Sequence, residues 1–218
     1  DVNGDGYADV IVSAPYSSVP GLAEAGMVYV FHGSSSGLGA TPAWTRAGGQ
    51  AVERLGRSVA GAGDVNADGY ADVIVGAHNY QVGAAPDAGR VEVFHGSATG
   101  LSAFPDWAKN GTQADAGFGR SVAGAGDVNG DAYSDVVIGE AYYSNGEAEE
   151  GRAMVFHGGM NGLAAEPDVI WEGNQAGAYF GRKVAAAGDV DGDGYSDVIV
   201  AAPYYSNGQF EEGRIFLF

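Results

Sequence analysis

The residues best suited to chemistry lie in a ten-residue acidic segment that occurs four times. The copies are DVNGDGYADV at 1–10, DVNADGYADV at 64–73, DVNGDAYSDV at 127–136 and DVDGDGYSDV at 189–198. In each copy side-chain oxygens stand at positions 1, 3, 5 and 9, and position 7 offers its backbone carbonyl. Oxygen ligands at this spacing fold around a hard cation, and glycines at positions 4 and 6 permit the sharp turns. Each segment therefore predicts a cation-binding loop.

The predicted cofactor is Ca²⁺, about four ions for the chain. Five or six oxygens plus water suit Ca²⁺, whereas Mg²⁺ keeps most of its water and binds through one or two carboxylates. The segments are similar to the first half of an EF-hand loop, but position 12 is Val or Ile inside a strand instead of the bidentate glutamate. The predicted ligands, with tyrosines contributing backbone carbonyls, are Asp1, Asn3, Asp5, Tyr7, Asp9, Asp64, Asn66, Asp68, Tyr70, Asp72, Asp127, Asn129, Asp131, Tyr133, Asp135, Asp189, Asp191, Asp193, Tyr195 and Asp197.

The competing interpretation is that these acids form ordinary Asx-turns, because Asp, Asn and Gly are common turn residues. Four copies in register favour metal binding. The loops hold 13 of the 28 acidic residues, and carboxylates a few ångströms apart repel one another unless a cation lies among them. Ala67 replaces glycine at position 4 and Ala132 replaces it at position 6. If position 6 needs a positive φ, Ala132 costs about 1 kcal/mol, and the loop at Asp127 is the weaker site.

The acidic loops are part of a longer repeating unit of about 62 residues. A β-branched run follows each loop, a second strand ends in Phe, a third segment carries Trp, and SVAGAG or KVAAAG precedes the later loops. Four short strands per unit are typical of a β-propeller blade, and the small-residue strand is expected innermost. The repeated markers are Phe31, Phe94, Phe156 and Phe218; Trp44, Trp107 and Trp171; and Leu55-Gly56-Arg57, Phe118-Gly119-Arg120 and Phe180-Gly181-Arg182.

The predicted fold class is therefore all-β, a partial or strand-sharing propeller formed by one repeat array over 1–218. We expect an incomplete first blade at 1–53, complete blades at 54–116 and 117–178, and an incomplete fourth blade at 179–218. The favoured explanation for the incomplete blades is that the sequence is part of a longer chain. The alternatives are that a partner supplies the missing strands or that the chain closes a four-bladed ring.

The repeats also resemble a known family. FGRSVAGAGDVNGDAYSDVVIGEA at 118–141 and FGRKVAAAGDVDGDGYSDVIVAAP at 180–203 are similar to the FG-GAP repeat of the integrin α-chain propeller and its bacterial relatives. The resemblance implies a calcium-bearing propeller, extracellular or on the cell surface, that serves adhesion or ligand binding. It also implies metal loops on one face and ligand loops on the other. Fold alone does not define the function.

Composition and histidine placement exclude several classes of function. The net charge of −18 argues against nucleic acid as a partner, and no apolar run reaches the ~20 residues that membrane insertion needs. The absence of cysteine excludes disulfides and thiolate metal sites. His32, His95 and His157 share one repeat position and are expected to be structural, while His78 alone breaks the symmetry. No nucleophile elbow or phosphate loop is present, so the chain is expected not to be an enzyme.

The variable loops at 16–26, 79–89, 142–151 and 204–213 combine tyrosines with acids. They either bind a protein or carbohydrate ligand or pack blade to blade. The leading hypothesis is a calcium-stabilised extracellular adhesion or recognition module. The alternatives are a surface protein that associates with copies of itself through open strand edges, and an accessory propeller of a secreted hydrolase.

Overall fold

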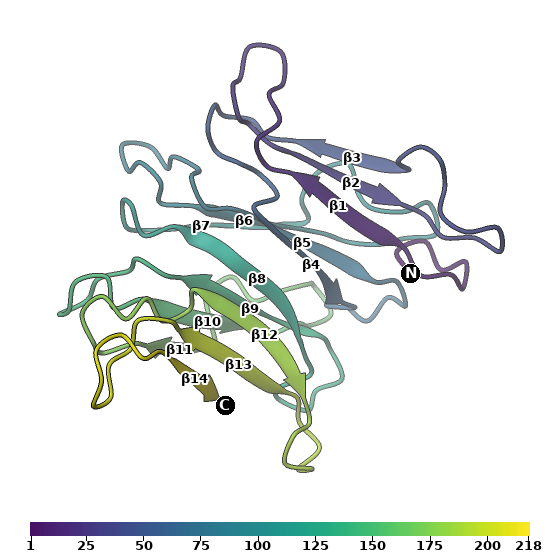
Figure 1. The fold of residues 1–218 in the computed structure, drawn as a ribbon. Helices are drawn as coiled ribbons and strands as arrows, with labels where there is room; N and C mark the ends of the chain where they lie inside the picture. Colours follow the sequence, from purple (N-terminus) through teal and green to yellow (C-terminus); the bar gives the residue numbers. More distant parts are fainter.

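The computed structural model describes all residues 1–218, which form β-strands in four antiparallel sheets and no helix (Figure 1). No helix is therefore available to cross a lipid bilayer. The first sheet contains β1 (Val10–Ala14), β2 (Met27–Phe31) and β3 (Trp44–Ala47); the second contains β4 (Ser58–Gly63), β5 (Asp72–Ala77), β6 (Arg90–Phe94) and β7 (Trp107–Asn110); the third contains β8 (Phe118–Gly126), β9 (Asp135–Glu140), β10 (Arg152–Phe156) and β11 (Val169–Glu172); the fourth contains β12 (Lys183–Gly188), β13 (Asp197–Ala202) and β14 (Arg214–Leu217).

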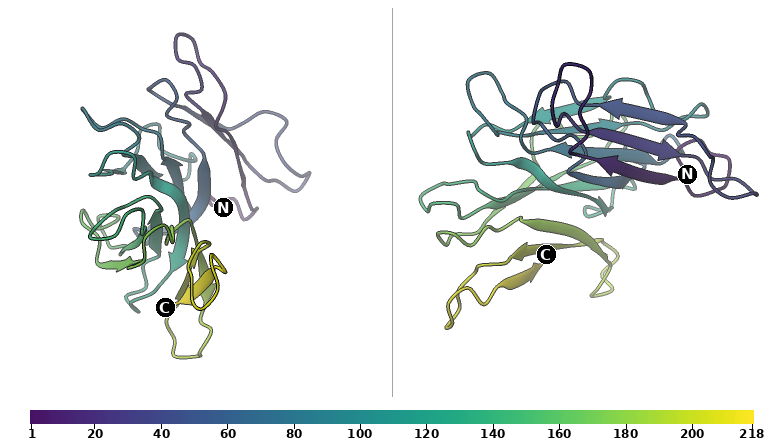
Figure 2. Two further views of the ribbon diagram at one scale, coloured as in Figure 1. Left: turned by 60° about the vertical axis from the view of Figure 1, so that its left-hand side comes forward. Right: turned by 45° about the horizontal axis from the view of Figure 1, so that its top comes forward.

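Each sheet is a simple meander in which strands that are neighbours in sequence pair with each other. The second and third sheets have four strands, and the first and fourth have three. The sheets follow one another through the molecule as successive blades (Figures 1 and 2). The predicted all-β, propeller-type fold is confirmed, with the small-residue segment, the β-branched run and the segment that ends in Phe forming β4, β5 and β6 of the second sheet.

The small-residue strands β4, β8 and β12 lie side by side, one from each of three successive blades. They are held close by hydrogen bonds from the backbone of one strand to a serine of the preceding one. Val122 N donates to Ser58 Oγ at 3.1 Å, and Val184 N donates to Ser121 Oγ at 3.2 Å. A Cβ at Gly124 would lie 2.7 Å from the carbonyl oxygen of Gly61. Glycine and alanine are required here because the strands approach too closely for larger side chains.

The blades also meet at a second glycine contact, which explains the Phe-Gly pair of each repeat. A Cβ at Gly76 would overlap the carbonyl oxygen of Gly119 in the next blade, and a Cβ at Gly139 would overlap that of Gly181. Phe118 precedes Gly119 and Phe180 precedes Gly181, and both phenylalanines are buried, at 2% and 1% exposure. One dipeptide therefore supplies both a backbone contact and a core side chain.

The core lies between blades, and repeated aromatic residues fill its outer part. Trp44 of β3 packs edge-to-face on Phe94 of the next blade at 4.8 Å, and Trp107 packs on Phe156 at 5.2 Å. The Trp44 indole Nε1 donates to the carbonyl oxygen of Ser102 at 2.9 Å. Trp107 donates in the same way to Ala164 at 3.0 Å. Each tryptophan thus joins the outer strand of its own blade to the following one.

One buried polar residue breaks the repeat symmetry. His78 is 7% exposed, its Nδ1 has no hydrogen-bond partner, and Ala141 is the equivalent residue in the third repeat. Burial, together with the charges of Arg120, Arg57 and Arg54, lowers the pKa of His78 to about 4. The imidazole is therefore neutral at pH 7.

The first prediction concerns the glycine contact between blades. Gly139→Ala should lower the free energy of unfolding by about 1–3 kcal/mol, because the new methyl group meets backbone that cannot move without separating the sheets. Gly49→Ala is the matched control, since Gly49 is exposed, does not have a positive φ, and an added Cβ would have no neighbour within 4 Å. Urea unfolding of the two variants measures the difference. Equal stabilities would contradict the importance of this contact.

The second prediction concerns His78. Below pH ~6.5 the unfolded chain binds a proton at this histidine that the native state does not bind, so stability falls from pH 6.5 towards the native pKa of about 4. His78→Ala removes this contribution. Between pH 7 and pH 4.5 the variant should therefore lose about 2–3 kcal/mol less stability than the wild-type chain, as measured by urea unfolding at both pH values. Identical losses would show that burial does not lower the pKa of His78 in the native state.

Candidate metal centre in the acidic loops

The acidic segments lie at one end of the blades. Residues 64–71 join β4 to β5, residues 127–134 join β8 to β9, residues 189–196 join β12 to β13, and residues 1–9 precede β1. Because β4, β8 and β12 lie side by side, the loops that follow them lie at the same end of the three strands (Figure 1). The repeated sequence thus becomes a row of similar loops.

The aspartate at position 1 organises each loop by accepting backbone hydrogen bonds. In the first loop Asp1 Oδ1 accepts from Gly4 N and Asp1 Oδ2 accepts from Gly6 N, both at 2.7 Å. Asp127 and Asp189 make the equivalent pairs of bonds. Partial burial opposes ionisation of Asp127, but amide hydrogen bonds outweigh it and hold the pKa of this carboxyl below its usual range. The loop backbone thus favours a charged aspartate at position 1.

The aspartate at position 9 fixes the loop to the rest of its blade. Asp72 is fully buried, and its two oxygens accept from Val65 N at 2.8 Å and Gly96 N at 2.9 Å. Asp135 repeats this arrangement with Val128 and Gly158. Burial raises the pKa of Asp72 to about 6 and also raises the pKa of Asp135, although the amides counteract it. A cation beside these carboxylates would favour their ionised form.

The donor set of the loops fits a hard divalent cation. In the fourth loop the carboxylates of Asp189, Asp191 and Asp197 lie within 4.8 Å of one another. None of the loop aspartates forms an ion pair with lysine or arginine. Closely spaced carboxylates without a cation repel, and Ca²⁺ is a cation that takes such oxygens as ligands.

The other three loops bring together fewer carboxylates, because position 3 is asparagine. In the first loop Asn3 Oδ1 accepts from Asp5 N at 3.2 Å, and Asn3 Nδ2 donates to Asp5 Oδ2 at 3.1 Å. The Asn66 and Asn129 amides make the same bonds in their loops. The structure thus gathers three acidic ligands only in the fourth loop, and the full set of predicted ligands stays a prediction.

Both alanines of the loops occupy the left-handed region. Ala67 has φ of 55° and Ala132 has φ of 71°, at positions where the first loop has Gly4 at 71° and Gly6 at 88°. An L-residue in this region costs about 1–2 kcal/mol. Backbone strain therefore affects the second loop as well as the third. The sequence predicted such strain only for Ala132 in the third loop.

The position-7 tyrosines do more than present a carbonyl group. The Tyr70 ring covers Gly4 of the preceding loop so closely that a Cβ there would lie 2.6 Å from Tyr70 Cε1, and Tyr195 covers Gly130 at the same distance. The rings therefore join neighbouring loops. The sequence signal was the presence of tyrosine at this position in all four copies.

The repeated histidines are part of the same scaffold. The Nδ1 atoms of His32 and His95 lie 3.2 Å from Asn3 Nδ2 and 3.3 Å from Asn66 Nδ2. The His32 ring also faces Gly100 of the next blade, where a Cβ would lie 3.2 Å away. These contacts give the histidines a role in packing and loop orientation, which sequence analysis expected only in general terms.

Several tyrosines of the variable loops pack against aromatic and arginine side chains, both within a blade and, at Tyr142–Tyr179, between two blades. Tyr179 contacts Tyr142 and Tyr204 edge-to-face, each at 5.2 Å, and Arg120 lies over the Tyr142 ring at 5.0 Å. Arg152 lies over Tyr143 at 3.6 Å. Packing was one of the two roles considered for these tyrosines. Tyr179, which completes the cluster, stands next to the repeated Phe-Gly pair and was not selected from the sequence.

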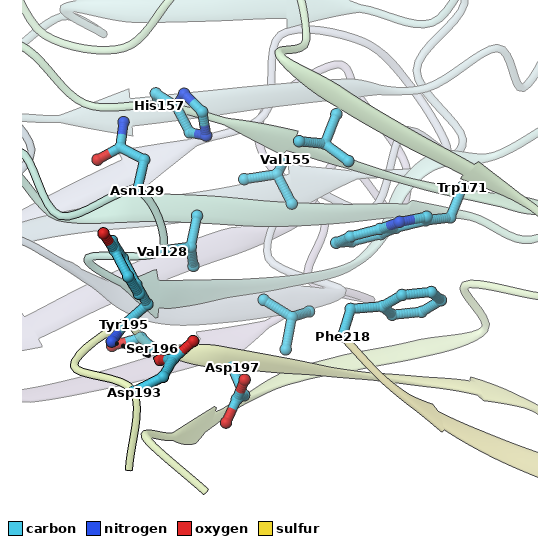
Figure 3. A pocket seen from close by; sticks show the side chains of 12 residues that line it. Val128, Asn129, Val155, His157, Trp171, Asp193, Tyr195, Ser196, Asp197 and Phe218 are labelled. Carbon is cyan, nitrogen blue, oxygen red and sulfur yellow. Dashed lines mark hydrogen bonds between the residues drawn. The ribbon is translucent and has the colours of Figure 1, made fainter. Parts of the chain in front are cut away.

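An apolar cavity with a volume of about 410 Å³ lies between the third and fourth blades, beside the acidic loops (Figure 3). Trp171 and Phe218 stack at 4.1 Å on one side, and His157, Asn129 and Tyr195 lie on the other. Leu101 and Leu163 pack into the core clusters at the two preceding junctions. The cavity therefore lies at a blade junction whose two preceding equivalents are filled by core leucines.

Comparison with known proteins identifies the repeat. Residues 1–31, 55–94, 118–156 and 180–218 match the FG-GAP repeat model. The chain is 36% identical over 161 residues to integrin alpha-IIb of Mus musculus, which covers 71% of this chain and 15% of the integrin. It is 34% identical over 169 residues to phosphatidylinositol-glycan-specific phospholipase D of Bos taurus, covering 74% of this chain and 20% of the relative.

A third relative, integrin alpha-5 of Xenopus laevis, is 29% identical over 192 residues, which cover 84% of this chain and 18% of the integrin. The chain thus spans a fifth or less of the length of these three relatives. The family match extends over all four repeats and includes each acidic loop. The chain belongs to the FG-GAP repeat family.

Proposed function

We propose that this chain is a non-enzymatic, calcium-stabilised recognition module that works outside the cell or at its surface. The observation that carries the calcium role is the set of four loops with matching backbone hydrogen bonds around aspartates that have no cationic partner. The similarity to integrin alpha chains supports adhesion or recognition and a cell-surface location. The partner in this proposal is a protein or carbohydrate ligand.

Calcium at these loops would contribute a large share of the stability. Extracellular modules bind Ca²⁺ with Kd of about 10⁻⁴–10⁻³ M, and a free concentration about tenfold above Kd adds ~1.4 kcal/mol per site. Four sites then add about 6 kcal/mol, which is comparable to the ~5–15 kcal/mol of an ordinary domain. Chemically, the ion would neutralise the loop carboxylates and hold the connections between the first two strands of each blade.

A second candidate function is that of an accessory module in a secreted hydrolase. The similarity to a phospholipase D favours it, because the same kind of repeat occurs in a protein named as an enzyme. Self-association through strand edges is the third hypothesis, and the exposed Ile215 and Leu217 of β14 support it. In both cases the loops keep their proposed calcium role.

Removal of calcium tests the proposal directly. Excess EDTA should lower Tm steeply or unfold the chain at pH 7, and added Ca²⁺ should restore the original melting curve, as measured by circular dichroism. The effect should fade as pH falls towards ~4, because the loop aspartates must be ionised to bind the metal. Mg²⁺ at the same concentration serves as the control. An unchanged Tm in EDTA would show that the acids act only as turn formers.

The fourth loop offers a matched substitution. Asp191→Asn gives this loop the same donor set as the first, so it should weaken Ca²⁺ binding at one site about 30-fold, since a unit charge and a divalent cation ~4 Å apart interact by about 2 kcal/mol in water. Calorimetric titration should show that the tightest class of site is altered while the number of sites is unchanged. Asp115→Asn, an exposed acid outside the loops, is the charge-matched control. Equal titration curves for both variants would contradict the assignment of Asp191 as a ligand.

A further inference from the structure

Four basic side chains gather at the end of the inner strands opposite the acidic loops. Arg57, Arg120, Arg182 and Lys183 are the only residues that line a cavity of about 180 Å³. The three arginines share one repeat position, directly after the Leu-Gly or Phe-Gly pair; Arg57 precedes β4, Arg120 lies within β8 and Arg182 precedes β12. Because these strands lie side by side, the repeat brings equivalent arginines together.

A cluster of four basic residues is unexpected in this acidic chain, which has 10 basic and 28 acidic residues. Arg46, Arg54, Arg90, Arg152 and Lys109 each pair with a glutamate. Arg214 instead stacks on Phe216 and Tyr205. The remaining four basic residues are the cavity residues, and none of them forms an ion pair.

Local packing holds two of the guanidinium groups in place. Arg120 is half-buried and lies over the Tyr142 ring at 5.0 Å, while Arg182 Nη1 donates to the Tyr142 hydroxyl oxygen at 3.1 Å. Aromatic stacking and a hydrogen bond orient these groups but leave their charge uncompensated. An orientated, partly desolvated guanidinium is well suited to bind an anion.

The neighbouring groups confirm a positive potential at this end of the molecule. Burial lowers the pKa of Arg120, the Tyr142 side chain opposes this, and the charges of Arg182 and Arg57 lower it further. Arg120 and Arg57 also contribute, after burial, to the low pKa of His78. Cations that lower one another's pKa are stabilised by any anion that enters among them.

We propose that the Arg57, Arg120, Arg182 and Lys183 cavity binds a doubly charged oxyanion, either a free sulfate or phosphate ion or such a group carried on a larger ligand. Arginine forks match the oxygens of these groups, and a dianion offsets more of the four positive charges than a single carboxylate does. The cavity is smaller than the ~300–1,000 Å³ typical of sites for whole small molecules, so it suits one charged group. This site is separate from the calcium loops and goes beyond the proposed function.

The test is a calorimetric titration of the whole chain with inorganic sulfate, with Ca²⁺ present and with chloride at equal ionic strength as the reference. The double variant Arg57→Gln/Lys183→Gln removes two exposed charges without disturbing the core and should raise the Kd for sulfate at least 10-fold. Arg120→Gln should do the same, and an unchanged Tm shows that it is folded. Arg214→Gln, an exposed arginine outside the cavity, should leave the Kd unchanged.

Glucose 6-phosphate, whose phosphate monoester is a dianion above pH ~7, separates the two sources of the anion, and glucose is the uncharged control that should not bind. Affinity for glucose 6-phosphate no higher than that for sulfate supports a site for the free ion, and tighter binding of glucose 6-phosphate supports a site for a carried group. The proposal is overturned if neither sulfate nor glucose 6-phosphate binds saturably at millimolar concentration, if glucose binds as well as glucose 6-phosphate, or if Arg214→Gln weakens binding as much as the cavity variants. The calcium response of Tm in the same variants is read separately, so failure here is distinguishable from failure of the calcium proposal.

Discussion

The close approach of backbones between successive blades is the constraint on which the rest of the structure depends. Gly76 faces Gly119 and Gly139 faces Gly181 without room for a methyl group, and the inner strands meet at Gly61 and Gly124. This spacing places β4, β8 and β12 side by side and buries the phenylalanine of each Phe-Gly pair. The equivalent arginines are therefore brought together, and each of Trp44 and Trp107 reaches the phenylalanine of the next blade.

That arrangement separates charge along the inner strands. The acidic loops follow the last residues of β4, β8 and β12, while Arg57, Arg120 and Arg182 stand at or near their beginning. A strand of six residues is about 20 Å long, which exceeds the Debye length of ~8 Å at physiological ionic strength. The two ends therefore act as independent electrostatic environments, so cations at one end do not neutralise the loops at the other.

Much of the fold could be predicted from the sequence because the repeat makes each signal appear several times. The positions of the acids, Phe, Trp and small residues define strands that recur with the same register, and the structure places them as expected. The ring of Tyr70 on Gly4, the position of Tyr179 between two other tyrosines and the convergence of the arginines could not be predicted. These features depend on contacts between blades, and the distance between neighbouring blades is not encoded in the pattern of any one repeat.

The tryptophan bridges bear on how the array resists mechanical force. At the inner radius the blades are joined by glycine backbone contacts and serine hydrogen bonds, and at the outer radius Trp44 and Trp107 reach across to Ser102 and Ala164. Two lines of attachment at different radii prevent one blade from rotating about the other as about a hinge. A force applied to one blade is then shared by both sets of contacts. We therefore expect neighbouring blades to move together as one rigid body and not to bend relative to each other.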